Sequence, residues 1–154
     1  MTTDQKPTLR VFSEGVPIFT SHGHWLYPLF ELEAYVVEQP VEPARLLLED
    51  TIIGKAAAAL IHRLGFRTVK TGVLSRLGEA IFQRYQIVYT YTQLVERIHC
   101  QTEAQLASVD DPEEIYRLIQ IRRNAHRLYA PRLLVPDTSS RAESGRQPRC
   151  PRVR

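Results

Sequence analysis

Apolar and polar residues follow strand-like and helix-like periods in turn along most of the chain. Near the start, two short runs of strand-forming residues flank a Ser-Glu-Gly turn, and apolar residues at helical spacing follow them. This pattern predicts a β-hairpin over 9–20 and a helix over 25–37. Pro17 marks an edge position or a bulge in the hairpin, because proline cannot donate to a strand ladder.

The middle of the chain alternates between short β-like runs and longer helical runs. A helix over 55–64 has almost no polar face and ends at Gly65, so we expect it to be buried on most sides. A further helix is expected to begin at Thr92 and to carry Leu94, Val95 and Ile98, and the pattern leaves open whether it continues through Cys100 to Leu106. The other predicted elements are strands at 44–48, 67–74 and 86–91, a polar elbow at 49–54, and helices from Ser75 to Tyr85 and from Asp111 to about Tyr129.

The resulting order, β-β-α-β-α-β-α-β-α-α, predicts an α/β fold in which helices cover both faces of one sheet, a three-layer α/β/α single domain. The predicted domain spans 8–130. It is preceded by a flexible N-terminus (1–7) and followed by a basic tail (131–154), which is expected to be disordered because it contains little apolar surface.

Charge is distributed unevenly along the 154 residues. Residues 136–154 contain five arginines and two acidic residues, Asp137 and Glu143. This segment therefore carries the whole formal net charge of +3, and residues 1–135 are formally neutral. We therefore expect no nucleic-acid surface on the folded domain. No apolar run is long enough for a membrane span, and no secretory signal is visible. We therefore expect a cytoplasmic protein that does not associate with membranes.

Gly54-Lys55, at the mouth of a helix, suggests a phosphate-binding turn. A Walker loop requires a glycine where this chain has Glu49 and a hydroxyl residue where it has Ala56, so that motif is excluded. Two interpretations remain. The helix N-terminus and Lys55 bind an anion, or Gly54 allows close packing while Lys55 reaches solvent.

Metal and thiol chemistry have weak candidates. His22 and His24 provide too few ligands for a metal site, and so does the cluster of His99, Cys100 and Glu103. Cys100 and its neighbour His99 point in different directions on a helix, so a small buried thiol is the simpler interpretation. No metal and no cofactor are expected.

Three further residues have structural explanations. His62, within an apolar helix, is interpreted as a core histidine, and Ser75 as a helix cap. Cys150 lies in the predicted tail, far from Cys100 in the sequence, so no disulfide framework is expected.

The stretches EDTIIGKAAAALI, KTGVLSRLGEAIFQRYQI, CQTE and DDPEEIY resemble a bacterial and archaeal family, domain of unknown function 1893, which is grouped with the cytidine-deaminase-like fold. The resemblance extends from about Leu9 to Leu118. It departs from the family pattern at Gln101, where the family has proline, and in a shortened loop before Cys100. The positions that match the family pattern are Asp50, Gly54, Lys55, Ala56, Ala57, Ala58, Ser75, Cys100 and Glu103.

This resemblance implies a mixed sheet of the cytidine-deaminase type, in which the 50–55 elbow stands where a zinc-binding His-x-Glu would be. Because the chain lacks that motif and a cysteine three residues after Cys100, zinc-dependent deamination is not expected. The resemblance instead implies a pocket at the elbow that binds a small anionic or nucleotide-like ligand. Its expected ligand-binding residues are Asp50, Gly54, Lys55, Ser75, Cys100 and Glu103.

Two alternatives to ligand binding stay open. The protein is an enzyme that uses Cys100 or Lys55 as nucleophile, with Glu103 or Asp50 as base. Otherwise it is a structural or regulatory module that self-associates, for example as a homodimer. The partner of Lys55 is likewise open, since either Asp50 or a bound anion would neutralise a cation at a helix N-terminus.

Overall fold

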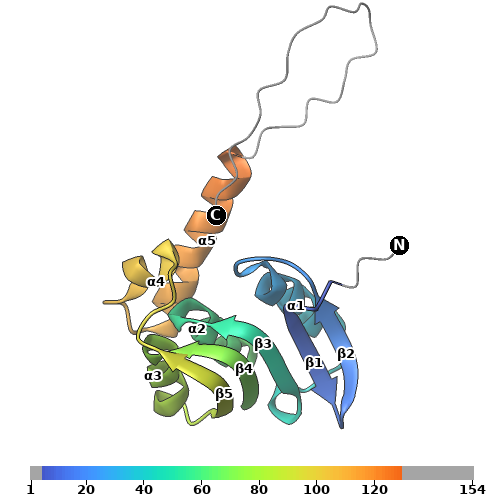
Figure 1. Cartoon of the computed structure of the whole chain (residues 1–154). Coiled ribbons are helices and arrows are strands. Elements are labelled where there is room, and N and C mark those ends of the chain that lie inside the picture. Colours follow the sequence, from blue (N-terminus) through green and yellow to red (C-terminus); the bar gives the residue numbers. More distant parts are fainter. Residues whose placement is uncertain (1–4, 130–154) are drawn as a thin grey trace, which may run out of the picture.

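The structure is a computed structural model that describes residues 5–129. Figure 1 shows strands gathered into one sheet, with helices packed around it. The predictions for the basic tail, 131–154, lie outside the described residues, as do those for residues 1–4 of the predicted flexible N-terminus.

The described chain forms one five-stranded sheet with the strand order β2-β1-β3-β4-β5. Strand β1 is antiparallel to both of its neighbours, whereas β3, β4 and β5 are parallel to one another. In chain order the elements are β1 (Leu9–Ser13), β2 (Val16–Ser21), α1 (Tyr27–Glu38), a 3-10 helix (Pro43–Arg45), β3 (Leu47–Ile53), α2 (Lys55–Leu64), β4 (Thr68–Ser75), α3 (Arg76–Arg84), β5 (Val88–Val95), α4 (Gln101–Leu106) and α5 (Pro112–Tyr129).

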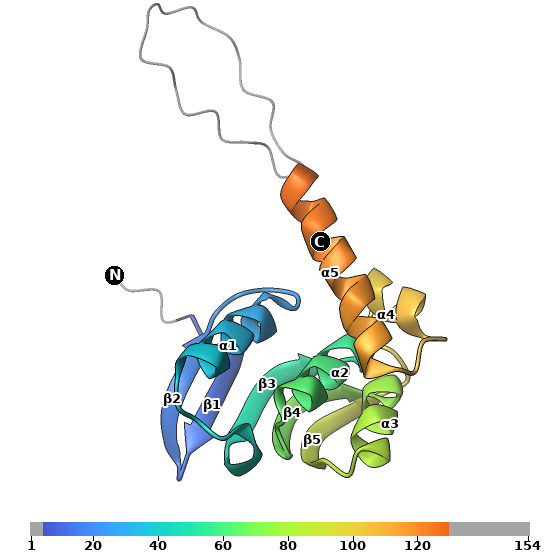
Figure 2. The ribbon, with the colours of Figure 1, turned by 180° about the vertical axis from the view of Figure 1, so that it is seen from behind.

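Helices α1, α2 and α3 lie against the face of the sheet seen in Figure 2, and α5 packs against α2. The mixed sheet with five α-helices confirms the predicted single α/β domain and is consistent with the three-layer α/β/α arrangement. None of the helices in the described part combines the length and apolar character needed to cross a bilayer.

Helix α2 is the centre of the core. Residues 55–61 are all buried, which confirms the prediction from its missing polar face. The helix ends at Gly65, whose φ of 91° is in the left-handed region and whose N–H donates to the carbonyl of His62. The His62 ring stacks on Tyr85, with 3.8 Å between ring centroids, so this histidine lies at the edge of the core.

The hairpin is also confirmed. Strand β2 is an edge strand, and its pairing with β1 shifts register between Val11 and Phe12, where Phe12 faces Pro17. Both features predicted from this proline, an edge position and a bulge, are therefore present.

Two predictions at strand boundaries are wrong. The segment 44–48 begins as a 3-10 helix and becomes strand only at Leu47, and strand β3 then continues to Ile53 through most of the predicted elbow. The helix expected from Thr92 is instead the second half of β5, because β4 continues to Ser75 and pairs with β5 as far as Val95. Pairing with a neighbouring strand along this whole stretch outweighs the local preference for helix of Gln93 and Leu94, and the β-branched Thr92 and Val95 suit a strand.

Candidate ligand pocket

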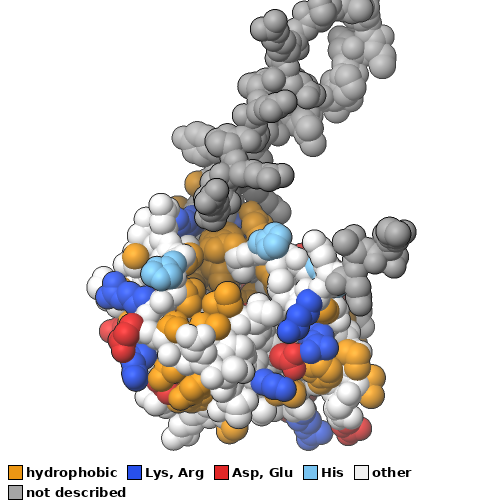
Figure 3. Space-filling view, in the orientation of Figure 1, with side chains coloured by type: hydrophobic (Ala, Val, Ile, Leu, Met, Phe, Trp, Pro, Cys, Tyr) orange, Lys and Arg blue, Asp and Glu red, His pale blue; other side chains and the backbone are white. Residues whose placement is uncertain are grey.

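A cavity of about 760 Å³ lies at the carboxyl ends of the parallel strands. Three segments surround it: the loop before α1, the N-terminus of α2, and the segment that leads from β5 into α4. Figure 3 shows apolar side chains gathered in this hollow, with histidines at its rim. Its apolar walls include Trp25, Leu26, Pro28, Ile52, Val73 and Val95.

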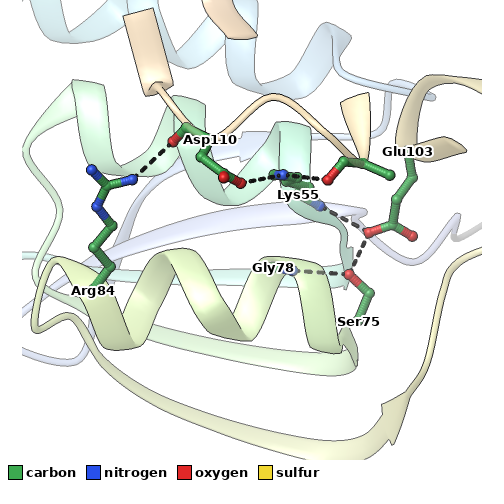
Figure 4. A network of polar contacts seen from close by, with 7 residues as sticks. Lys55, Ser75, Gly78, Arg84, Glu103 and Asp110 are labelled. Atoms are coloured by element: carbon green, nitrogen blue, oxygen red, sulfur yellow. Dashed lines mark hydrogen bonds and ion pairs between the residues drawn. The ribbon is translucent and has the colours of Figure 1, made fainter. Parts of the chain in front are cut away.

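Glu103 is buried and occupies the N-terminus of α2 (Figure 4). Its Oε1 accepts a hydrogen bond from the backbone N–H of Lys55 at 3.0 Å and another from the hydroxyl of Ser75. Its Oε2 accepts from the backbone N–H of Ile98 at 2.6 Å. Because Gly54, the N-cap residue, has no side chain, this carboxylate from α4 supplies the cap that α2 lacks.

Ser75 links the same carboxylate to α3. Its Oγ accepts a hydrogen bond from the N–H of Gly78 at 3.1 Å, which confirms the predicted capping role. The hydroxyl proton is donated to Glu103. Ser75 therefore connects the first turns of α2 and α3, and it does not line the cavity.

Lys55 is buried, so the interpretation in which its side chain reaches solvent is wrong. Its Nζ donates to the carbonyl of Ala107 at 3.0 Å and pairs with Asp110 Oδ1 at 2.9 Å. The hydrogen bond from Lys55, followed by its charge, holds the pKa of the exposed Asp110 carboxyl below its usual range. Asp50 is not the partner of this lysine, although the sequence had offered it as a candidate.

Gly54 is required for space and not for backbone conformation. Its φ of −102° is accessible to any residue. A Cβ at this position would lie 2.5 Å from Ile98 Cδ1 and 3.1 Å from Glu103 Oε1. The packing interpretation of this glycine is therefore confirmed.

Asp50 lies in the wall of the cavity, where β3 approaches its carboxyl end. Burial raises the pKa of its carboxyl to about 7, although the backbone amides of Ile52 and Thr51 partly oppose the shift. Among the side chains that the structure describes, residues 5–125, none donates a hydrogen bond to this carboxyl. It is thus an acceptor in an apolar wall that the protein leaves without a side-chain donor.

Cys100 and His99 also line the cavity, just before α4. The thiol is partly buried and His99 is exposed. In the described part of the chain, no three His, Cys, Asp or Glu side chains lie close enough together to hold a metal ion. His22 does not line the cavity, whereas His24 does.

The sequence thus identified residues that the fold brings together, but it assigned some of them the wrong neighbours. Asp50, Gly54, Lys55, Cys100 and Glu103 all line one cavity, and Ser75 is hydrogen-bonded to Glu103. The residues that sequence reasoning missed as parts of the site are Trp25, Ile98, Arg97 and Asp110. All four lie on loops. Asp110 opens the DDPEEIY stretch, which predicts a helix start and not a partner for Lys55, and the segments around the other three contain no motif that marks a site.

Fold and cavity together define a mixed α/β domain with an apolar pocket at the carboxyl ends of its parallel strands. Residues 10–122 match the family model described as domain of unknown function (DUF1893). The chain belongs to this family.

One solved structure provides a comparison of the fold. It is a DUF1893 family protein, TM1506, from Thermotoga maritima, which matches with a TM-score of 0.67 and 24% sequence identity. The match covers 75% of this chain and 80% of that one. No curated protein matches the chain significantly. The likeness to TM1506 concerns the fold alone.

Proposed function

We propose that this protein binds a small nucleotide-like ligand in the cavity beside 50–55, on a deaminase-like fold that does not carry out zinc chemistry. The observation that supports this function is the cavity itself. Its volume of about 760 Å³ falls within the range of about 300–1,000 Å³ that small-molecule sites occupy. Its place outside the carboxyl ends of parallel strands is where open α/β sheets bind ligands.

The lining residues suggest how such a ligand would be held. The apolar wall, with Trp25 and Ile52, suits a flat ring, and Asp50 can accept a hydrogen bond from it. Arg97, His24 and His99 are exposed at the cavity, where Arg97 offers positive charge to an anionic group and the two imidazole rings can donate hydrogen bonds to it. This rim would take the role that the sequence had suggested for Lys55, whose ammonium group is already paired.

Covalent chemistry by Cys100 is a second candidate, supported by one observation: its partly exposed thiol lines the same cavity. Iodoacetamide labelling of a Cys150→Ser protein tests it, because only Cys100 then remains to react. A nucleophilic role predicts labelling much faster than that of free cysteine. Ordinary reactivity argues against this candidate and leaves ligand binding unaffected.

Native mass spectrometry of freshly purified protein tests the proposed function. We expect a retained small molecule on the wild-type chain, and we expect Ile52→Trp to remove it, because the larger ring fills the cavity. Val16→Trp is the matched control, since Val16 is similarly exposed (61% against 52%) but lies on β2 and does not line the cavity. A ligand retained equally by both variants would place it outside the cavity.

A retained ligand can be lost during purification, so a second measurement is needed. A nucleotide and nucleoside panel is screened by thermal unfolding on the wild type and on both tryptophan variants. We expect stabilisation of the wild type and Val16→Trp only, because a ligand stabilises just the protein that binds it. If the wild type neither retains a ligand nor responds to the panel, the proposed function is wrong.

A further inference from the structure

We infer that the strand wall of the cavity selects ligands that present a cationic or hydrogen-donating nitrogen to Asp50, carried on an apolar ring. This inference rests on the proposed function and narrows it to a chemical class. The sequence predicts an anionic group of the ligand at this elbow, whereas this inference places a cationic or hydrogen-donating group there.

The usual place for an anion is already filled by the protein itself. The first N–H of α2, that of Lys55, donates to Glu103, and the Lys55 ammonium group donates to Ala107 and Asp110. An anion bound at this helix end would have to displace Glu103. That displacement would also leave the hydroxyl of Ser75 and the N–H of Ile98 without their acceptor.

The donors at the start of α2 have acceptors within the protein, whereas the Asp50 carboxyl is an acceptor that has no side-chain donor among the described residues. It shares the cavity wall with the apolar side chains of Ile52 and Val73. A carboxyl group in such surroundings is costly to ionise, and the raised pKa of about 7 agrees with this. A nitrogen donor from a ligand would supply the missing hydrogen bond and favour the ionised carboxylate.

The charges of the wall favour the same class of ligand. Two carboxyl groups, those of Asp50 and Glu103, face the cavity, against one lysine whose charge Asp110 already offsets. Arg97, whose charge is available to a ligand, is exposed at the rim. An anionic group would therefore be oriented outward and a nitrogen donor inward.

Trp25 provides a fixed surface for the ring. Its indole N–H donates to Thr102 Oγ1 at 3.2 Å, which ties the side chain to α4. Trp25 also contacts Phe30 edge to face, with 5.9 Å between ring centroids. A rigid aromatic wall costs little entropy when a flat ligand binds against it.

Three probes of nearly the same shape test this inference on the full chain: 2-naphthamidine, 2-naphthamide and 2-naphthoate. Titration calorimetry at pH 8 gives their dissociation constants. We expect the amidine to bind at least tenfold more tightly than the naphthoate, with the neutral amide between them. Asp50→Asn should weaken amidine binding at least tenfold and remove the preference.

Glu49→Gln is the matched control. Glu49 is the preceding carboxylate on β3, but it pairs with Arg10 and does not line this cavity. This variant should keep the ranking of the three probes. The ranking on the wild type needs no variant, so the inference can be tested even if Asp50→Asn does not fold.

The outcomes separate this inference from the proposed function. Equal or tighter binding of the naphthoate overturns the inference while leaving a ligand-binding cavity. An amidine affinity that is unchanged in Asp50→Asn also overturns the inference and leaves the ligand-binding cavity. If none of the three probes binds, the inference is wrong, and the retained-ligand and nucleotide experiments decide separately whether the proposed function fails with it.

Discussion

The Glu103 carboxylate accepts a hydrogen bond from the backbone N–H of Lys55 at 3.0 Å, and so caps α2 from a segment 48 residues further along the chain. Gly54 cannot cap this helix itself, because its lack of a side chain is what makes room for Glu103 and Ile98. The glycine and the glutamate are therefore one structural unit: the space left by the first is occupied by the carboxylate of the second.

Loss of this cap should be costly. Glu103→Ala leaves the N–H groups of Lys55 and Ile98 and the hydroxyl of Ser75 without an acceptor. Each unsatisfied buried group costs about 1–3 kcal/mol, so we expect a loss of at least about 3 kcal/mol in the free energy of unfolding. Glu103→Gln, which keeps one acceptor oxygen, should lose less. Urea unfolding measures both variants.

Glu96→Ala is the control for this measurement. Glu96 also forms an ion pair, with Arg76, but its side chain is 84% exposed, so we expect a change of about 1 kcal/mol or less. If Glu103→Ala behaved like this control, Glu103 would not be the cap of α2.

The steric part of the same unit can be tested by substitution at Gly54. Gly54→Ala places a methyl group 2.5 Å from Ile98 Cδ1, and overpacking of this kind costs about 1–3 kcal/mol. In an Ile98→Ala background that clash is removed, so the added cost of Gly54→Ala should fall by at least about 1 kcal/mol. A double-mutant cycle in urea measures this difference. Strictly additive costs would show that Ile98 does not limit this position.

Lys55 should behave as a core residue. Its stem and ammonium group are buried, so Lys55→Ala should lower the free energy of unfolding by about 2–4 kcal/mol even without a ligand. Lys55→Met keeps most of the packed volume and should lose less. Lys70→Ala is the control, because that lysine is 63% exposed and should change stability by at most about 0.5 kcal/mol. Thermal and urea unfolding compare the three variants, and a neutral Lys55→Ala would contradict the buried position.

Asp50 should make stability depend on pH in a defined direction. Its pKa rises from 3.8 to about 7 on folding, so between these values the folded protein holds a proton that the unfolded chain has lost. Stability should therefore fall as pH rises from about 4 to 7, by about 4 kcal/mol at most, since one pKa unit corresponds to about 1.4 kcal/mol. The remaining solvent contact of this carboxyl reduces that limit.

Comparison with Asp50→Asn isolates this contribution, because the other titrating groups are shared. The variant should gain stability relative to the wild type as pH is raised from 5 to 8 in urea unfolding. A difference between Asp50→Asn and wild type that does not vary with pH would contradict the raised pKa.

Several elements follow from the sequence alone. Helix α2 and its C-terminal glycine are determined by an apolar run without a polar face and by a residue that tolerates positive φ. The hairpin follows from two strand-forming runs around a glycine turn, and the irregular edge strand follows from Pro17. The cap at Ser75 follows from the helix after it. In each case the interactions that decide the conformation lie within a few residues, so the local pattern contains them.

Only the tertiary structure decided the second half of β5 and the neighbours of the site residues. Residues 92–95 become strand because β4 extends beside them for its full length, and pairing with a strand from elsewhere in the chain is not visible in their own pattern. The Lys55 ammonium group pairs with Asp110, 55 residues further along the chain, and the Lys55 backbone N–H donates to Glu103, 48 residues further along. The sequence determined which chemical groups gather at the elbow. Folding sets the distances between segments that are far apart in the chain. These distances decided which of the groups neutralise one another, and they left Asp50 without a side-chain donor among the described residues.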